Sequence, residues 1–474
     1  MLDSIKHCVE KGETLGADFV EARYEDLTLR TLDRTDDTWK EIQSKSRRGI
    51  GVTCYVEGVS GFSFTASLEK GDLEATTERS YRMAKASAGA AKLKLPFDER
   101  PAVKSSASDT RSVKIHPRKR ELSYKTDMVN RAVETAREHG ENIKNVRGLY
   151  GELFGQKLLT NSDGSVVDWE FLVTDLRCSV TARTDEGNLV TGREGHGGTF
   201  GLEFFETDGQ TPEDIGATAG DIAKEQLEAK ACPAGQFRTL IENHLVGVLA
   251  HESFGHLSEA DFVVTGGSPL TGKMEERLGT KHATIVDGGV PDIDELGGLW
   301  VPFDDQGIPG SMTKILDKGV LTHYLHNRGT AEKLGEKPTG NARAVNFVFP
   351  PIPRMTNTFF EPGDLTEEEA LEMVDEGVYA IQTSGGQVSG DGSFLFKAIR
   401  GYWVEDGEIQ YPLREVSLSG NILQLLSQVE GATKELELYS GYFGGCGKGG
   451  QYPLPTGLGG PKLVMDGVTF GGEA

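Results

Sequence analysis

The sequence contains no long run of apolar residues. A helix that crosses a membrane needs about 18 or more consecutive apolar residues, and no segment of the 474-residue chain meets this requirement. The first 16 residues are charged and amphipathic, without the apolar core of a secretion signal. The first absence argues against a transmembrane helix, and the two together predict a cytoplasmic protein with no membrane partner.

Basic residues are scarce relative to acidic ones. Lys and Arg together number 50, whereas Asp and Glu number 73, and the formal net charge is -23 at pH 7. A surface with this excess of negative charge repels the phosphate backbone of nucleic acids and anionic lipids. We therefore expect no nucleic-acid partner.

Cysteine is scarce as well, with five residues in the whole chain. An odd number of widely spaced cysteines excludes the disulfide framework of a small secreted domain. Four of them are interpreted as ordinary buried residues: Cys8, Cys54, Cys178 and Cys232. Cys446 differs because it lies in the glycine-rich stretch GGCGKGG, where the backbone can approach an ion closely.

Glycine, by contrast, is abundant, with 61 residues, and this favours many tight turns and a β-rich structure. Apolar periodicity predicts helices over residues 2–15, 71–90, 120–138 and 212–230. Alternating residues predict strands near 20–24 and 50–56, and a loop is expected around 195–201. The turn Asn161-Ser162-Asp163-Gly164 between two alternating runs predicts a β-hairpin.

The pattern changes after residue 235. A short strand, 237–241, leads into one strong helix at about 244–256, and many short strand-like runs follow. Thr366 and Glu369 form a candidate capping box for a second helix. The length favours two or three domains. We predict an α+β protein with N-terminal helix and antiparallel-sheet domains at 1–95 and 118–230. A β-rich C-terminal domain at 235–474 would carry the helix.

The segment with the clearest chemistry is His251-Glu252-Ser253-Phe254-Gly255-His256 on this helix. It is one residue longer than the H-E-x-x-H zinc motif. Residues five apart lie about 140° apart around an ideal α-helix and cannot hold one ion together. A π-bulge can absorb the extra residue, and Gly255 would ease a local break. Metal binding therefore requires a distorted helix near residues 253–255.

A catalytic zinc site needs a third protein ligand and an open position. The residues alone leave several candidates for the third ligand: Cys446, His282, His323, His326, Glu259 and Asp261. The histidines at 323 and 326 lie in an alternating run and are interpreted as surface or structural residues. The glycines around Cys446 favour it, and a buried inert thiol is the alternative.

Several stretches, spread over almost the whole chain, resemble the TldD/PmbA family, and specifically its TldD-type members. They are Gly16-Ala17-Asp18 with Glu21-Ala22-Arg23, Asn161-Ser162-Asp163-Gly164, His251-Glu252 to His256 with Glu259-Ala260-Asp261, Phe303-Asp304-Asp305-Gln306-Gly307, Pro353-Arg354-Met355-Thr356-Asn357-Thr358, Gly385-Gly386-Gln387-Val388 and Gly445-Cys446-Gly447-Lys448-Gly449-Gly450-Gln451. The chain departs from the family at Gln306, where glutamate is frequent, and at 341–343.

The resemblance implies a metallopeptidase that acts on unfolded peptides and holds one Zn²⁺ per catalytic subunit. The implied ligands are His251, His256 and Cys446. The resemblance also implies a homodimer, or a heterodimer with a PmbA-type chain that lacks the metal motif. Because this chain keeps the full motif, it is similar to the catalytic subunit.

The expected mechanism follows from the residue types. Glu252 would act as the general base on a zinc-activated water and pass the proton to the leaving amine. An extended peptide could add to an exposed sheet edge, with a groove lined by Met355, Thr356 and Asn357 and by Gly385, Gly386 and Gln387. Two alternatives remain: a non-catalytic peptide-binding or scaffolding subunit with a structural metal, and a thiol hydrolase with Cys446 as the nucleophile.

Overall fold

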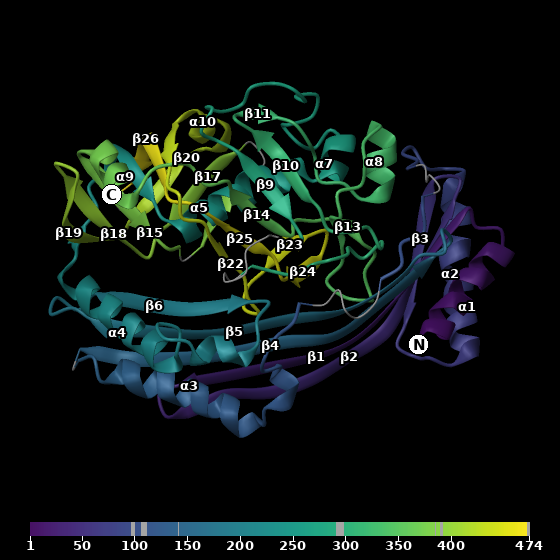
Figure 1. Cartoon of the computed structure of the whole chain (residues 1–474), viewed down its shortest axis with the longest axis horizontal. Coiled ribbons are helices and arrows are strands. Elements are labelled where there is room, and N and C mark those ends of the chain that lie inside the picture. The colour runs from purple at the N-terminus through teal and green to yellow at the C-terminus, as the bar shows by residue number, and fades with distance from the viewer. Residues whose placement is uncertain are drawn as a thin grey trace.

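The structure is a computed structural model that describes residues 1–95, 100–105, 111–140, 142–290, 298–383, 385–388 and 392–471. A long curved sheet forms the base of the molecule, and the β-rich C-terminal part lies on its concave side (Figure 1). Four helices lie on the opposite side of this sheet, two of them at the end where the N-terminus lies (Figure 1). The predicted α+β class is confirmed.

The curved sheet is antiparallel and has six strands in the order β3-β2-β1-β4-β5-β6. The strands are β1 (Phe19–Thr35), β2 (Thr38–Val56), β3 (Val59–Thr65), β4 (Ile143–Asn161), β5 (Val166–Arg183) and β6 (Leu189–Gly198). The predicted hairpin is confirmed, because β4 and β5 pair from Thr160 and Val166 onward. Gly164 in the turn has a φ of 79°, which glycine adopts without strain.

This sheet joins the first two predicted domains. Strand β1 pairs with β4 from Glu21 and Asn161 to Thr35 and Arg147, so segments before residue 95 and after residue 118 share one ladder of hydrogen bonds. The division into three domains at 1–95, 118–230 and 235–474 therefore remains a prediction. The first two of these segments contribute strands to one continuous sheet.

The four predicted N-terminal helices are confirmed, and each packs an apolar face against the curved sheet or a neighbouring helix. They are α1 (Leu2–Thr14), α2 (Lys70–Ala88), α3 (Leu122–Arg137) and α4 (Pro212–Glu228), with short 3-10 turns η2 (Pro117–Lys119) and η3 (Leu202–Glu206). In α3, for example, Met128, Val129 and Ala132 are buried in one cluster with Tyr150 and Leu176 of the sheet. Periodicity predicted these helices well because packing uses one face of each.

The loop predicted around residues 195–201 is wrong for its first half, because β6 continues through Gly198. The glycines serve close packing there. A Cβ on Gly197 would lie 2.5 Å from the carbonyl oxygen of Ser440. The edge of the curved sheet can therefore touch the C-terminal part at backbone distance.

The C-terminal part contains two larger sheets and two small ones. The larger of these two sheets has ten strands. Nine follow the order β16-β17-β20-β26-β8-β15-β18-β19-β7, and the tenth, β21, pairs with β26. Its strands are β7 (Lys230–Ala231), β8 (Gly235–Ile241), β15 (Gly377–Ile381), β16 (Gly386–Val388), β17 (Ser393–Lys397), β18 (Arg400–Glu405), β19 (Glu408–Arg414), β20 (Ser417–Asn421), β21 (Val429–Ala432) and β26 (Leu463–Phe470).

The second sheet of the C-terminal part has the order β11-β10-β9-β14-β25-β22. Its strands are β9 (Ile285–Gly288), β10 (Met312–Asp317), β11 (Val320–Leu321), β14 (Asn357–Phe360), β22 (Glu437–Tyr439) and β25 (Gly457–Gly460). The two small sheets are separate antiparallel pairs: β12 (Ala342–Arg343) with β13 (Ile352–Pro353), and β23 (Cys446–Lys448) with β24 (Gln451–Leu454).

Helices in this part are short. They are α5 (Asn243–Ala250), α6 (His256–Ser258), α7 (Ala260–Val264), α8 (Arg328–Leu334), α9 (Glu367–Val374) and α10 (Ile422–Ser427), with a π-helical turn η4 (His251–Gly255) between α5 and α6. The capping box of Thr366 and Glu369 begins α9, as predicted. Helix α5 lies in the main C-terminal core, with Leu245, Val246 and Leu249 buried. Within the described residues, no helix has the length and apolar character required to span a bilayer.

Candidate metal centre

Helix α5 leads into the π turn η4, which begins with His251, and His256 follows as the first residue of α6. The helix begins at Glu242, whose side chain accepts a hydrogen bond from the Leu245 amide at 3.3 Å. At its end the ladder widens, and the His256 amide donates to the His251 carbonyl. This i to i+5 bond turns residues five apart toward the same side. The predicted π-bulge is therefore confirmed. It brings His251 and His256 to the same side of the helix, which an ideal α-helix would not do.

Gly255 allows the π turn to pack against the C-terminal core. A Cβ at this position would collide with the Sδ atom of Met355. Met355 is fully buried, and it therefore fixes the turn from behind. The Met355 side chain thus occupies the space that a side chain at residue 255 would need.

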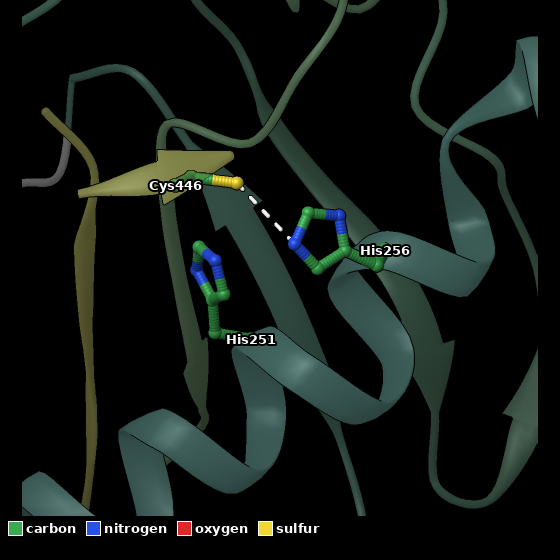
Figure 2. A group of neighbouring side chains, drawn as sticks. All are labelled: His251, His256 and Cys446. Atoms are coloured by element: carbon green, nitrogen blue, oxygen red, sulfur yellow. Dashed lines mark hydrogen bonds between the residues drawn. The ribbon is translucent and has the colours of Figure 1, made fainter. Parts of the chain in front are cut away.

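The structure brings His251, His256 and Cys446 together, with candidate ligand atoms all within 4.8 Å of one another. The Cys446 Sγ lies 3.3 Å from His256 Nε2. The two imidazole rings stand at 86° with their centroids 5.1 Å apart. Figure 2 shows the thiol of β23 and the two rings from η4 and α6 pointing toward one another. Residues 190 positions apart in the chain thus meet at one point.

The donor set fits zinc. Burial alone would raise the pKa of Cys446, but the nearby His251 and His256 lower it to about 5. A site made of one thiolate and two imidazoles binds zinc in preference to magnesium or calcium. Cys446 and His251 are also buried, and His251 Nδ1 has no hydrogen-bond partner within the described part of the chain.

Glu259 orients His256. Its carboxylate is fully buried and lies 2.9 Å from His256 Nδ1. A hydrogen bond at Nδ1 directs Nε2 toward the Cys446 thiol, as carboxylates do for many metal-binding histidines. The sequence had offered Glu259 as a candidate ligand, but the structure places it behind the ring.

Lys448 and Arg354 connect the cysteine hairpin to Glu259. Lys448 Nζ lies 3.2 Å from the Glu259 carboxylate and 2.6 Å from that of Asp261. Arg354, also fully buried, donates to the Cys446 carbonyl oxygen at 2.7 Å. The elements that carry the thiol and the second imidazole are therefore held together by ion pairs as well as by packing.

Replacing Glu259 by glutamine is expected to lower zinc affinity by roughly 10- to 100-fold, the usual effect of removing a carboxylate behind a metal-binding histidine. The amide keeps the shape but removes the charge that holds the Nδ1 proton. Competition with a chelator of known affinity measures the change. Glu276→Gln, an exposed carboxylate paired with Lys273, is the matched control. Equal zinc affinity in Glu259→Gln and the wild type would contradict the orienting role.

Glu252 directly follows His251 on the π turn η4. Together with His251 it lines a cavity of about 190 Å³. The side chain is half-buried, and among the described residues it has no hydrogen-bond partner. A carboxylate with this exposure and freedom can reach a molecule in the cavity.

The other candidate ligands lie elsewhere. His282 is exposed, and His323 Nδ1 lies 2.9 Å from the Lys314 carbonyl oxygen. Burial, followed by the charge of His323, lowers the pKa of the buried His326 to about 4. Asp261 is bound by Lys448. In the described part of the chain, no fourth His, Cys, Asp or Glu joins the group.

Three of the residues expected to bind substrate are buried instead. Met355, Thr356 and Asn357 have relative exposures of 0%, 1% and 0%. Thr356 donates to the Asp287 carboxylate at 2.6 Å, and the Asn357 amide donates to the Leu299 carbonyl at 2.9 Å. Their side chains hold strand β14 and the core beside the π turn, and they present no surface to a peptide in this conformation.

The second predicted stretch lies at a sheet edge. Gly385 and Gly386 are exposed, and β16 is the terminal strand of the larger C-terminal sheet. Residues of β16 approach the π turn. The Gln387 side chain lies outside the described residues. Among the described residues β16 pairs on one side only, with β17, and it contacts the π turn that carries Glu252.

Sequence reasoning missed Arg177, His244 and Tyr439, which line the cavity with Glu252. One signal was available: His244 precedes His251 by seven residues, which places both on one face of a helix. Arg177 had no local signal, because it lies in strand β5 of the curved sheet, far in sequence from the other residues that line the cavity.

Comparison with known proteins agrees with these observations. The PmbA/TldA metallopeptidase domain 1 matches residues 20–84, the central domain matches 115–227 and the C-terminal domain matches 234–472. The metalloprotease MJ0996 of Methanocaldococcus jannaschii is 32% identical over 461 residues, which cover 97% of each chain. The zinc metalloprotease TldD homolog of Saccharolobus solfataricus is 28% identical, covering 98% of this chain and 99% of its own.

Among solved structures, TldE from Thermococcus kodakarensis has the same fold. The TM-score is 0.80 at 16% sequence identity, over 99% of this chain and 100% of that one. Family matches along most of the chain, and relatives named as TldD homologs, lead to one conclusion. The chain belongs to the PmbA/TldD metallopeptidase family and is a TldD-type member of it.

Proposed function

We propose that this chain is a zinc-dependent metallopeptidase that hydrolyses unfolded or extended peptides. His251, His256 and Cys446 would hold one Zn²⁺ per chain, and Glu252 would be the general base. We also propose that it works as a homodimer or as a heterodimer with a PmbA-type chain. Relatives named as metalloproteases support the reaction class, and the family resemblance supports the pairing.

The observation that carries this proposal is the convergence of three ligand groups beside a half-buried carboxylate at a cavity. Catalytic zinc sites use three protein ligands and keep one position open, whereas structural sites close with four. Since no fourth ligand joins the group within the described residues, the geometry favours catalysis over the scaffolding alternative with a structural metal.

When bound, zinc supplies Lewis-acid chemistry, which polarises the scissile carbonyl and makes water a nucleophile at neutral pH. The chain's own residues do the rest. Glu252 accepts the proton of the attacking water and delivers it to the nitrogen of the leaving amine. Glu259 keeps His256 in one orientation. The cavity wall holds the peptide against these groups.

Strand β16 supports the preference for extended peptides. An added strand would bind through backbone hydrogen bonds, which read little of the side-chain sequence. A folded protein cannot offer such a strand without opening. A Cβ on Gly385, directly before β16, would meet no described atom within 4 Å, so another backbone has room to approach there.

A second candidate function is thiol hydrolysis. The Cys446 Sγ and His256 Nε2 are 3.3 Å apart, and the neighbouring imidazoles lower the thiol pKa to about 5 against the effect of burial. These features also suit a cysteine nucleophile with a histidine base. The presence of a second imidazole and of Glu252 at the same point favours the metal instead.

Chelation separates the two functions. Dialysis of the purified protein against a strong chelator is expected to remove zinc and to abolish cleavage of an unstructured peptide. Addition of Zn²⁺ should restore cleavage. Cleavage rates and metal content per chain are the measurements. A chain that contains no zinc and cleaves the peptide equally well in chelator would be a thiol enzyme, and the zinc proposal would fail.

A further inference from the structure

The cavity beside the candidate metal centre is built from two parts of the molecule. Its lining includes His244 and Glu252 of the α5–η4 segment, Tyr439 and Phe443 from the approach to Cys446, and Arg177 from strand β5 of the curved sheet. Among the described residues, Arg177 is the one lysine or arginine in this lining. A cation from the curved sheet therefore shares a cavity with the proposed general base.

The guanidinium of Arg177 is held in a fixed orientation. Its Nε and Nη2 donate to the two carboxylate oxygens of Asp175, each at 2.8 Å. Nη2 also donates to the Phe443 carbonyl oxygen at 3.0 Å. Asp175 is fully buried and also accepts from the Phe443 amide. A planar guanidinium with one edge fixed in this way presents its other end in a single direction.

The other end of this guanidinium is available. No hydrogen bond from Nη1 exists within the described part of the chain, and the Arg177 side chain is 41% exposed. Asp175 offsets part of the positive charge, but it does not use the Nη1 donors. The side chain can therefore donate to a molecule in the cavity without giving up its own support.

His244 supplies a second unpaired polar group. Its Nδ1 is buried and has no hydrogen-bond partner among the described residues. The ring packs edge-on against Tyr439, with centroids 5.0 Å apart. Burial, and then the charge of Arg177, lowers the pKa of His244 to about 4. The neutral ring has one N–H donor, and with that proton on Nδ1 the ring can donate to a ligand in the cavity. An unpaired buried polar atom is costly unless a ligand satisfies it.

These two residues define the chemistry of the ligand. A guanidinium and an imidazole N–H are both donors, and a guanidinium forms its strongest hydrogen bonds with planar anions. We propose that Arg177 and His244 form a subsite that binds a carboxylate of the peptide substrate. This inference rests on the proposed peptidase function and adds a substrate preference to it. The carboxylate can be the C-terminus of the peptide or an aspartate or glutamate side chain.

Four versions of one unstructured ten-residue peptide test the subsite. The C-terminus is a carboxylate or a carboxamide, and one internal residue is Glu or Gln. Binding is measured by calorimetry with the zinc-loaded Glu252→Gln variant, so that no turnover is needed. We expect one of the two carboxylates to improve affinity about tenfold, as a hydrogen bond to a charged group does. The pair of peptides that shows the difference identifies the source of the carboxylate.

Adding Arg177→Gln should bring this affinity ratio close to one, because glutamine keeps polar contact with Asp175 but has no charge. Arg177 also bonds the segment before Cys446, so zinc content is measured in parallel. His244→Phe leaves that bond intact and keeps the contact with Tyr439. It should lower the ratio about threefold, the effect of losing a neutral hydrogen bond.

Two results would overturn the subsite: equal binding of all four peptides, or an unchanged ratio after both substitutions. The fate of the proposed peptidase function is read separately, from cleavage of the same peptides by the wild type. A wild type that cleaves without any carboxylate preference refutes the subsite alone. A wild type that binds with the preference but never cleaves refutes the peptidase proposal alone.

Discussion

Replacing Glu252 by glutamine is expected to reduce peptide hydrolysis by roughly 10²- to 10⁴-fold, the usual contribution of a general base. The amide has the same size and can still contact water, but it cannot accept a proton. Zinc content should stay at the wild-type level, because the proposed ligand groups are His251, His256 and Cys446. The measurements are kcat/KM on an unstructured peptide and zinc per chain.

A matched substitution controls for the loss of one negative charge. Glu368→Gln removes an exposed carboxylate from the first turn of α9, far in sequence from the candidate centre, and it should leave hydrolysis unchanged. Turnover of Glu252→Gln at the wild-type rate with full zinc occupancy would remove Glu252 from the mechanism. Loss of zinc in this variant would instead show that the carboxylate belongs to the ligand set.

Replacing Cys446 by serine is expected to lower zinc affinity by more than roughly 100-fold, since changes behind a ligand already cost 10- to 100-fold. Serine is nearly the same size, but its hydroxyl stays protonated at neutral pH and is a poor ligand. Cys446 has its pKa lowered to about 5 because the neighbouring imidazoles outweigh burial, so the thiolate is the form present at pH 7. Chelator competition measures the affinity, and hydrolysis should fall with zinc content.

Cys232→Ser provides the control for this experiment. Cys232 is also buried, and its thiol contacts the Pro233 carbonyl rather than an imidazole. It should cost some stability but leave zinc affinity unchanged, and circular dichroism checks that both variants are folded. If Cys446→Ser keeps zinc as tightly as the wild type, another side chain completes the site. The family-derived ligand set would then be wrong for this chain.

The π turn shows how far sequence reasoning can reach. The spacing of His251 and His256 is incompatible with an ideal helix, so a shared ion demands a wider turn at a known place. The structure has that turn at residues 251–255. This turn could be predicted because helical geometry is local and depends on residue spacing alone.

The residues predicted to bind substrate show the limit of prediction from sequence. Met355, Thr356 and Asn357 form a distinctive polar and apolar stretch, which suggested a groove, yet all three are buried. Thr356 and Asn357 satisfy buried backbone and carboxylate groups, and Met355 fills the space left by Gly255. Polar residues in a core and polar residues in a groove look alike in sequence, because only the fold decides which side chains meet water.

The sequence by itself determined the α+β class, the amphipathic helices, the hairpin at Asn161–Gly164 and the distorted helix with its two histidines. Each depends on periodicity, turn chemistry or spacing between neighbours. Only the tertiary structure decided that the Cys446 thiol lies 3.3 Å from His256, that Glu259 lies behind the ring, and that Arg177 enters the cavity from another sheet. These contacts join segments far apart in the chain, and long-range packing rather than local preference brings them together.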